Sequence, residues 1–406
     1  MASLRSINQD DLRNHNLSVV IDTLLRAADP LSRADLAKET GLTKATMSVL
    51  VSLLLGGGIL EEGEPTGQSL YGRPSIPLVL KAGRICGMGL QVNTDGYGVI
   101  VQDINGTTVG ERWVDADMSN TDPRKVFASL NELAEEQEAR LAELGYTLAG
   151  TGLALPGLVT DDMCLFVARN LGWEQLDLKS FDVVKRLDAK ADNEANLAAL
   201  AQIPGYAMQR RGMGMLEPTA SFIYLSTDVG IGGALVRDGR VVRGDHGFGG
   251  EIGHVSVDMR GPVCRCGRRG CLEVYAGRRS MVGTAGIASG DAAATKDACD
   301  AMMALWRQRD SKTVAVVGKA LEAMASAIVS MVNMCDVDMV MLGGLWARFE
   351  PELIDRVERM VRSQALAYPK VRVRVRMADV VKRPALLGAA ESGLRRFVDN
   401  PLQFIA

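Results

Sequence analysis

The sequence predicts an α/β protein in which an N-terminal winged helix-turn-helix precedes a body of two similar lobes. Three observations predict this fold. Helical apolar patterns joined by a glycine-containing turn come before residue 80, and strands alternating with helices follow residue 84. The second half of the body also repeats the element order of the first. We therefore expect a DNA-binding domain over residues 1–82 and a ligand-binding body over residues 83–406.

Length and composition limit the possible classes of protein. The 406 residues correspond to about two or three domains. The chain is 47% hydrophobic and 23% charged with a net charge of -3, which argues against a uniformly basic coat for nucleic acid. No apolar run reaches the ~18 residues of a membrane span, and the N-terminus lacks the apolar stretch of a signal peptide. We expect a cytoplasmic protein without a membrane partner.

The head begins with an apolar helical stripe that ends at Asp29-Pro30. Two short helices are predicted next, over residues 33–39 and 44–55, with a turn at Gly41 between them. Two helices joined in this way are typical of a helix-turn-helix, whose second helix enters the major groove. The residues expected to contact DNA from that helix are Thr43, Lys44, Thr46 and Ser48.

A wing is predicted after the second of these helices. Two short strands, over residues 59–62 and 75–80, flank a loop that contains Gly72-Arg73-Pro74. Arg73 could enter a minor groove from this loop. However, residues 1–80 carry seven basic and nine acidic side chains, a poor balance for binding phosphates. The alternative is a helical bundle that binds protein, but the order of the elements favours DNA, with a dimer compensating for a weak electrostatic contribution.

The body shows internal repetition. Three strands, a helix and a strand are predicted in order over residues 85–92, 98–103, 109–114, 124–144 and 149–155. The same order recurs over residues 221–226, 233–237, 241–243, 314–334 and 337–342. We expect one lobe over residues 83–197 together with the last helix, 385–398, and a second lobe over 198–384. A ligand would lie in the cleft between the lobes, at the glycine-rich turns that follow the strands.

Three of the seven cysteines lie close together after a histidine. The set is His254, Cys264, Cys266 and Cys271, with Gly267 and Gly270 in the loop. Three thiolates and one imidazole form a closed tetrahedral set of the kind that holds structural Zn²⁺. The alternative is three unrelated buried cysteines. A catalytic zinc is disfavoured because four protein ligands leave no open position.

Several motifs together resemble the ROK family of repressors and sugar kinases. They are Gly250-Glu251-Ile252-Gly253-His254, the cysteine motif continuing to Leu272-Glu273, Asn193-Glu194-Ala195-Asn196, Asn170-Leu171-Gly172-Trp173, Pro156-Gly157 and Leu342-Gly343-Gly344. The resemblance implies a two-lobed actin-like or ribonuclease-H-like sugar-kinase fold, and the N-terminal head is typical of the repressor branch. Carried over to this chain, the family pattern implies sugar binding by Asn193, Glu194, Glu251, His254 and Glu273.

The chain departs from the kinase pattern at three places. Family kinases carry Asp-x-Gly-Gly-Thr where this chain reads Gln91-Val92-Asn93-Thr94-Asp95, and Asn-Asp where it reads Asn193-Glu194. Asp228 adds a negative charge to the second phosphate loop. The resemblance therefore implies a regulator without enzyme activity, most simply a repressor of carbohydrate-use genes. Its expected partners are operator DNA, a monosaccharide or sugar-phosphate effector, and further copies of itself in a homodimer or homotetramer. The alternative is an ATP-dependent sugar kinase with an accessory head.

Overall fold

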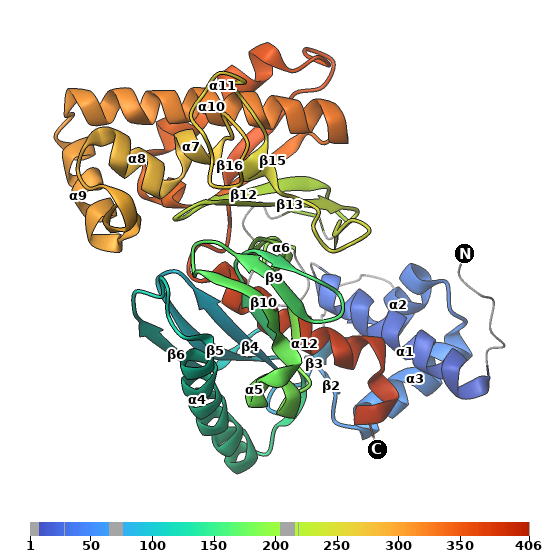
Figure 1. Cartoon of the computed structure of the whole chain (residues 1–406). Coiled ribbons are helices and arrows are strands. Elements are labelled where there is room, and N and C mark those ends of the chain that lie inside the picture. The colour runs from blue at the N-terminus through green and yellow to red at the C-terminus, as the bar shows by residue number, and fades with distance from the viewer. Residues whose placement is uncertain (1–7, 28, 65–75, 204–215, 218, 406) are drawn as a thin grey trace.

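The computed structural model describes residues 8–405 except 28, 65–75, 204–215 and 218. It consists of a small N-terminal head and two α/β lobes, with the head beside the first lobe and away from the second (Figure 1). The predicted fold class is confirmed. Elements missing from the prediction are short strands and several helices, most of them in the second lobe, described below.

The head contains three helices and a small sheet. The helices are α1 (Gln9–Arg26), α2 (Arg33–Thr40) and α3 (Lys44–Gly56), and the strands are β1 (Leu31–Ser32), β2 (Leu60–Glu62) and β3 (Pro77–Leu80). Each helix begins at a side-chain cap, as when the Ser32 hydroxyl accepts a hydrogen bond from the backbone N–H of Asp35. Strand β3 pairs antiparallel with both β2 and β1. Strand β1 was not predicted because two residues carry no periodicity.

The first lobe is built on a five-stranded sheet. Its strands are β4 (Ile85–Asn93), β5 (Gly96–Asp103), β6 (Thr108–Asp115), β7 (Thr147–Leu155) and β11 (Lys190–Asn193). The long helix α4 (Pro123–Leu144) connects β6 to β7. A three-stranded sheet of β8 (Leu158–Val159), β9 (Cys164–Ala168) and β10 (Trp173–Asp177), followed by α5 (Asp182–Arg186), is inserted after β7.

The second lobe repeats this sheet. Its strands are β12 (Phe222–Thr227), β13 (Ile231–Arg237), β14 (Arg240–Val241), β15 (Met339–Gly344) and β16 (Arg374–Met377). The order β14-β13-β12-β15-β16 corresponds strand for strand to β6-β5-β4-β7-β11 of the first lobe. In both sheets, taken in this order, each of the first three strands pairs antiparallel with its neighbour. The fourth strand is parallel to the third, and the fifth is parallel to the fourth. The internal repetition seen in the sequence is therefore a repetition of topology.

Helices of the second lobe form one large apolar core against its sheet. They are α7 (Glu273–Ala276), α8 (Arg278–Ala285), α9 (Lys296–Arg307), α10 (Ser311–Cys335) and α11 (Pro351–Gln364). Helix α10 is long and apolar enough to cross a membrane by length and composition, but half of its most apolar stretch is buried in the fold. The buried part of the helix, which includes Met324 and Ile328, packs in this core.

Two helices connect the parts of the molecule. Helix α6 (Glu194–Leu200) follows β11, and α12 (Pro384–Asp399) is the last α-helix of the chain. Helix α12 packs on β4 and β7 of the first lobe and on α6, and its C-terminal half lies against α1 of the head (Figure 1). Leu394, Phe397 and Val398 share one apolar core with the helices of the head. The head is thus joined to the body by a common core and not only by the chain.

Candidate functional site

The structure brings together the four residues expected to bind a metal. One ligand atom from each of His254, Cys264, Cys266 and Cys271 lies within 4.8 Å of all the others. The distance from His254 Nδ1 to Cys264 Sγ is 3.7 Å, and that from Cys266 Sγ to Cys271 Sγ is also 3.7 Å. Ligands about 2.3 Å from a tetrahedral ion are separated by about 3.8 Å. The geometry therefore fits a four-coordinate metal ion.

The loop that carries the cysteines is shaped by backbone contacts. The N–H of Cys264 donates to the carbonyl oxygen of Arg268 at 2.7 Å, and Ser256 and Cys271 form an isolated β-bridge. Gly270 has φ of +64°, and a Cβ there would lie 1.7 Å from the carbonyl oxygen of Asp258. The close approach of the two sides of the loop requires glycine at this position.

Two of the expected sugar-binding carboxylates lie on either side of this loop. Glu251 precedes the 3₁₀ turn Ile252–His254, and its Oε2 is 3.9 Å from Nε2 of His254. Glu273 is the first residue of α7, and its Oε2 accepts a hydrogen bond from the backbone N–H of Ile231 at 3.1 Å. A metal in the loop would hold the segments that position both side chains.

Two more of the five expected sugar-binding residues, Asn193 and Glu194, lie where β11 meets α6. Asn193 caps α6, since its Oδ1 accepts from the N–H of Ala195 at 2.7 Å while its Nδ2 donates to the carbonyl oxygen of Gly157. Glu194 receives a hydrogen bond from Nε2 of Gln91 at 3.3 Å. Burial raises the pKa of Glu194 to about 8, and the nearby charges of Asp228 and Asp95 add to the shift. Glu194 is therefore largely protonated at neutral pH.

The turn between β12 and β13 lies between these two groups. Asp228, at its start, interacts electrostatically with Glu194, and Ile231, at its end, binds Glu273. A Cβ on Gly230 would lie 2.2 Å from Glu273 Oε2 and 3.2 Å from Asn170 Nδ2, so the turn passes close to both side chains. One turn of the second lobe thus contacts expected ligand-binding groups from two parts of the chain.

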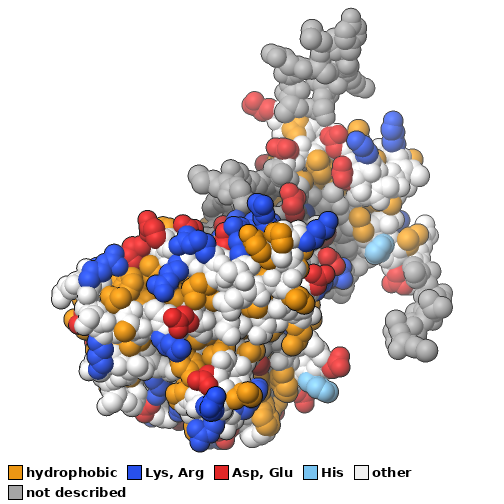
Figure 2. All heavy atoms as spheres, turned by 90° about the horizontal axis from the view of Figure 1, so that it is seen from above, with side chains coloured by type: hydrophobic (Ala, Val, Ile, Leu, Met, Phe, Trp, Pro, Cys, Tyr) orange, Lys and Arg blue, Asp and Glu red, His pale blue; other side chains and the backbone are white. Residues whose placement is uncertain are grey.

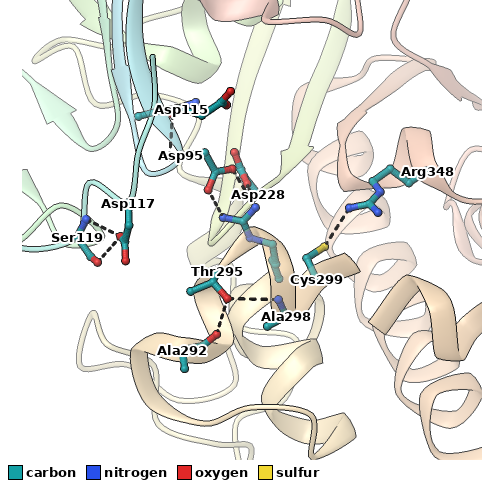
Figure 3. A network of polar contacts seen from close by, with 12 residues as sticks. Asp95, Asp115, Asp117, Ser119, Asp228, Ala292, Thr295, Ala298, Cys299 and Arg348 are labelled. Carbon is teal, nitrogen blue, oxygen red and sulfur yellow. Dashed lines mark hydrogen bonds and ion pairs between the residues drawn. The ribbon is translucent and has the colours of Figure 1, made fainter. Parts of the chain in front are cut away.

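A cavity of about 280 Å³ opens beside this turn, between the lobes. Its walls include Asp95, Asp117 and Asn170 from the first lobe and Val229, Arg279 and Thr295 from the second. Figure 3 shows Asp117 and Ser119 on one side of this region and Thr295 on the other. None of the five expected sugar-binding side chains belongs to the walls of this cavity, although Asn170 connects it to Glu273.

Arg278 is a residue of the cleft that the sequence analysis did not identify. Its guanidinium donates to both carboxylate oxygens of Asp95, at 2.7 and 2.9 Å, and lies 3.2 Å from Asp228. Figure 3 shows Asp95 and Asp228 close together at this contact. The two arginines after the cysteine motif were a possible signal, because two aspartates on facing turns require a cation. The separation of 183 residues between Arg278 and Asp95 conceals the pair in the sequence.

The expected DNA-contacting residues lie at the N-terminal end of α3. Thr43 caps the helix and its hydroxyl lies 2.9 Å from that of Thr46, so both are engaged in the cap. Lys44 and Ser48 are exposed, and so is Val49. Arg73 lies outside the described residues. The described part of the head therefore presents a short, mostly uncharged helix face.

Comparison with known proteins gives one family. A model of the ROK family matches residues 88–393. The xylose repressor of Bacillus subtilis is 30% identical over 68% of this chain and 69% of its own length. The xylose repressor of Caldicellulosiruptor bescii is 24% identical over 94% of this chain and 96% of its own. An N-acetylmannosamine kinase of Citrobacter koseri is 29% identical over 60% of this chain and 81% of its own.

Solved structures show the same fold. A ROK family transcriptional regulator, described as a homologue of the E. coli MLC protein, superposes with a TM-score of 0.76 at 21% identity over 97% of this chain and 99% of its own. A ROK family glucokinase from Streptomyces griseus, in complex with glucose and AMPPNP, has a TM-score of 0.61 at 20% identity and covers 76% of this chain and 98% of its own. The match to the regulator extends through the head, whereas the match to the glucokinase does not cover the whole chain.

Proposed function

Since the chain belongs to the ROK family, we propose that it is a sugar-responsive transcriptional repressor that binds operator DNA in the cytoplasm. The observation that carries this proposal is the joining of a winged head to a ROK body, which matches a protein named a xylose repressor over 94% of this chain. Its effector is a monosaccharide or a sugar phosphate, and its target genes serve carbohydrate use. The domain boundaries proposed are 1–82 for the head and 83–406 for the body.

The effector site proposed comprises Asn193, Glu194, Glu251, His254 and Glu273. Carboxylates, an amide and an imidazole can together bind several hydroxyl groups of a sugar ring. The four-ligand set around Cys266 is proposed to hold Zn²⁺, which would fix the loop between Glu251 and Glu273 and supply no reactive water. The site therefore binds without catalysis.

Loss of phosphoryl transfer is supported by the side chains at the two turns. Gln91 and Glu194 form a hydrogen-bonded pair, and Glu194 holds its proton at neutral pH, so it is a poor general base. Asp95 and Asp228 place two carboxylates where the kinase resemblance puts phosphate groups. The kinase is the second candidate, favoured by the similarity to N-acetylmannosamine kinases.

A DNA-retention assay tests the proposal. Full-length protein is mixed with the DNA upstream of its own gene and titrated with D-xylose, D-glucose and their phosphates. We expect retention without sugar and release by at least one of these compounds. Glu273→Ala should retain DNA but require far more sugar for release. No retention of any duplex at low salt would contradict the DNA-binding function, and ADP release from ATP with a sugar would favour the kinase.

Binding as a homodimer or homotetramer is part of the same proposal. The two heads of a homodimer would bind two half-sites on the DNA. The half-sites would be separated by about one helical turn of DNA or by a multiple of it. Sugar can change operator binding only by as much as its affinities for the two lobe arrangements differ. The lobe angle is the structural variable that links the cleft to the heads.

A further inference from the structure

Arg278 is a buried cation that joins the two lobes. It is the first residue of α8 in the second lobe, and its side chain is only 6% exposed. Its two terminal nitrogens bind both oxygens of Asp95, which lies in the β4–β5 turn of the first lobe. This bidentate geometry is the strong form of a charge-assisted pair. The contact is therefore an ordered link between the lobes.

The second lobe holds Arg278 in place from two directions. Its backbone N–H donates to the carbonyl oxygen of Asp228 at 2.9 Å, and its guanidinium lies 3.2 Å from the carboxylate of the same residue. On the first lobe, the N–H of Asp95 donates to Oδ1 of Asn93 at 3.0 Å, which fixes the turn that presents the carboxylate. Both ends of the link are held by local structure before they meet.

Charge explains why the link should be strong. Asp95, Asp228 and Glu194 surround this position, and burial raises the pKa of Asp228 to about 6. Near neutral pH Glu194 is largely protonated, so the guanidinium faces two carboxylates. Arg278 is the buried member of this set, whereas the side chains of Asp95 and Asp228 are 31% and 44% exposed. Without the guanidinium, the two carboxylates would repel each other across the lobes. The lobes therefore lose much of their preference for this arrangement if Arg278 loses its charge.

We propose that Arg278 is an interlobe latch, which fixes the lobe closure in which sugar is bound and fills the space that nucleotide phosphates would need. The two aspartates that replace residues of the kinase pattern are then its partners and not isolated repulsive charges. The effect of the latch on sugar binding rests on the proposed function. The contact of Arg278 with both lobes does not depend on that function.

The neighbouring residue provides a matched control. Arg279 has the same charge and begins the same helix, but it pairs with Asp291, which also belongs to the second lobe. Substituting Arg279 removes one arginine ion pair without removing an interlobe contact. Arg278→Gln, Asp95→Asn and the double variant therefore test the latch, and Arg279→Gln tests the loss of charge alone.

Hydrogen exchange of the full-length protein, measured without sugar, decides whether the latch exists. We expect backbone amides of residues 93–97 and 227–232 to exchange at least about tenfold faster in Arg278→Gln and in Asp95→Asn, which corresponds to about 1.4 kcal/mol. The double variant should exchange no faster than Arg278→Gln, because both lack the interlobe link to Asp95 and the contact with Asp228. Arg279→Gln should leave residues 93–97 at the wild-type rate.

Three results would overturn the latch. They are wild-type exchange in both Asp95→Asn and Arg278→Gln, faster exchange confined to one lobe, or equal effects of Arg278→Gln and Arg279→Gln. If Arg278→Gln does not fold, Asp95→Asn still tests the latch. It removes the same interlobe contact by changing a more exposed residue in the β4–β5 turn.

Calorimetric titration with D-xylose and D-glucose then tests the link to sugar. For a sugar that binds the wild type, Arg278→Gln should weaken affinity about tenfold, and Arg362→Gln, which removes an ion pair with Glu358 within α11, should not. Equal affinities would overturn this part of the proposal. A wild type that binds neither these sugars nor their phosphates would count against the proposed function, while the exchange result would still decide the latch.

Discussion

Glu194 shows how one side chain can change the chemistry of a site. It occupies the position at which the kinase pattern has an aspartate, and it faces Gln91 instead of a second acid. Burial raises its pKa to about 8. In the native protein the carboxyl therefore keeps a proton that the unfolded chain releases above pH ~4.5. A protonated acid can still donate to a sugar oxygen, but it accepts a proton poorly.

The pH dependence of stability follows from this shift. Because the native pKa lies above the unfolded one, the native state binds more protons between these values, and stability falls as pH rises from about 4.5 to about 8. Glu194→Gln mimics the protonated form and removes this loss. We expect its gain in stability to be near zero at pH 4.5 and on the order of 2 kcal/mol at pH 8, after allowance for screening in the cleft. Urea unfolding of the wild type and of Glu194→Gln at both pH values measures it, and an equal difference at the two pH values would contradict the raised pKa of Glu194.

Cys266 is the residue that tests the metal set. Its Sγ lies 3.7 Å from that of Cys271 in the four-residue cluster. Cys266→Ser should reduce bound zinc from about one ion per chain to a small fraction of that, and should lower the melting temperature. Elemental analysis and thermal unfolding measure the two effects. Cys335→Ser, at the end of α10 and outside the cluster, should keep the metal, and unchanged zinc in Cys266→Ser would refute the ligand set.

At the scale of elements, α12 owes its position to small residues. Glycines of β4 and β7 allow its backbone to approach the sheet, so that a Cβ on Gly89 or Gly152 would lie 2.3 Å from a carbonyl oxygen of the helix. On the opposite face, a Cβ on Gly388 would lie 1.8 Å from the carbonyl oxygen of Leu197 in α6. Helix α12 therefore connects the helix that carries Glu194 to the core of the head.

Two glycine substitutions with the same change in side chain test this packing. Gly388→Ala forces α12 away from α6 and should cost about 1–3 kcal/mol. Gly318→Ala lies in α10, where a Cβ would meet nothing within 4 Å, and it should stabilise by about 0.5–1 kcal/mol. Denaturant midpoints of the two variants should therefore move in opposite directions. A neutral Gly388→Ala would show that α12 is more loosely held than the structure indicates.

The elements also show what sequence patterns can predict here. The long helices α4, α10 and α12 and central strands such as β4 carry enough periodicity to be identified within a few residues of their ends, but α9 and α11 were not predicted. Strands β1, β11 and β16 were missed because two to four residues carry little pattern, and their pairing is determined by distant partners. The metal set was visible because its ligands are close in sequence. Arg278 was not, because its partner lies in the other lobe.

At the scale of the whole molecule, charge is spread and not concentrated. Among the described residues seen from above the second lobe, basic, acidic and apolar side chains are interspersed without a continuous patch of one sign (Figure 2). In the head, Arg26 pairs with Asp22 and Arg33 with Glu62. Several cations in the described part of the head are therefore already paired with carboxylates. Helix α12 and the shared core join the head to the body.

Salt dependence of operator binding measures this directly. Each phosphate contact adds about 0.9 to the slope of log K against log salt, so we expect a slope for a dimer shallower than about -6. Lys44→Ala removes the exposed lysine of α3 from both heads and should change the slope by about 2. Lys319→Ala, on α10 and paired with Glu322, removes the same charge far from the head and should leave the slope unchanged. Equal slopes in the two variants would mean that α3 does not face the DNA backbone.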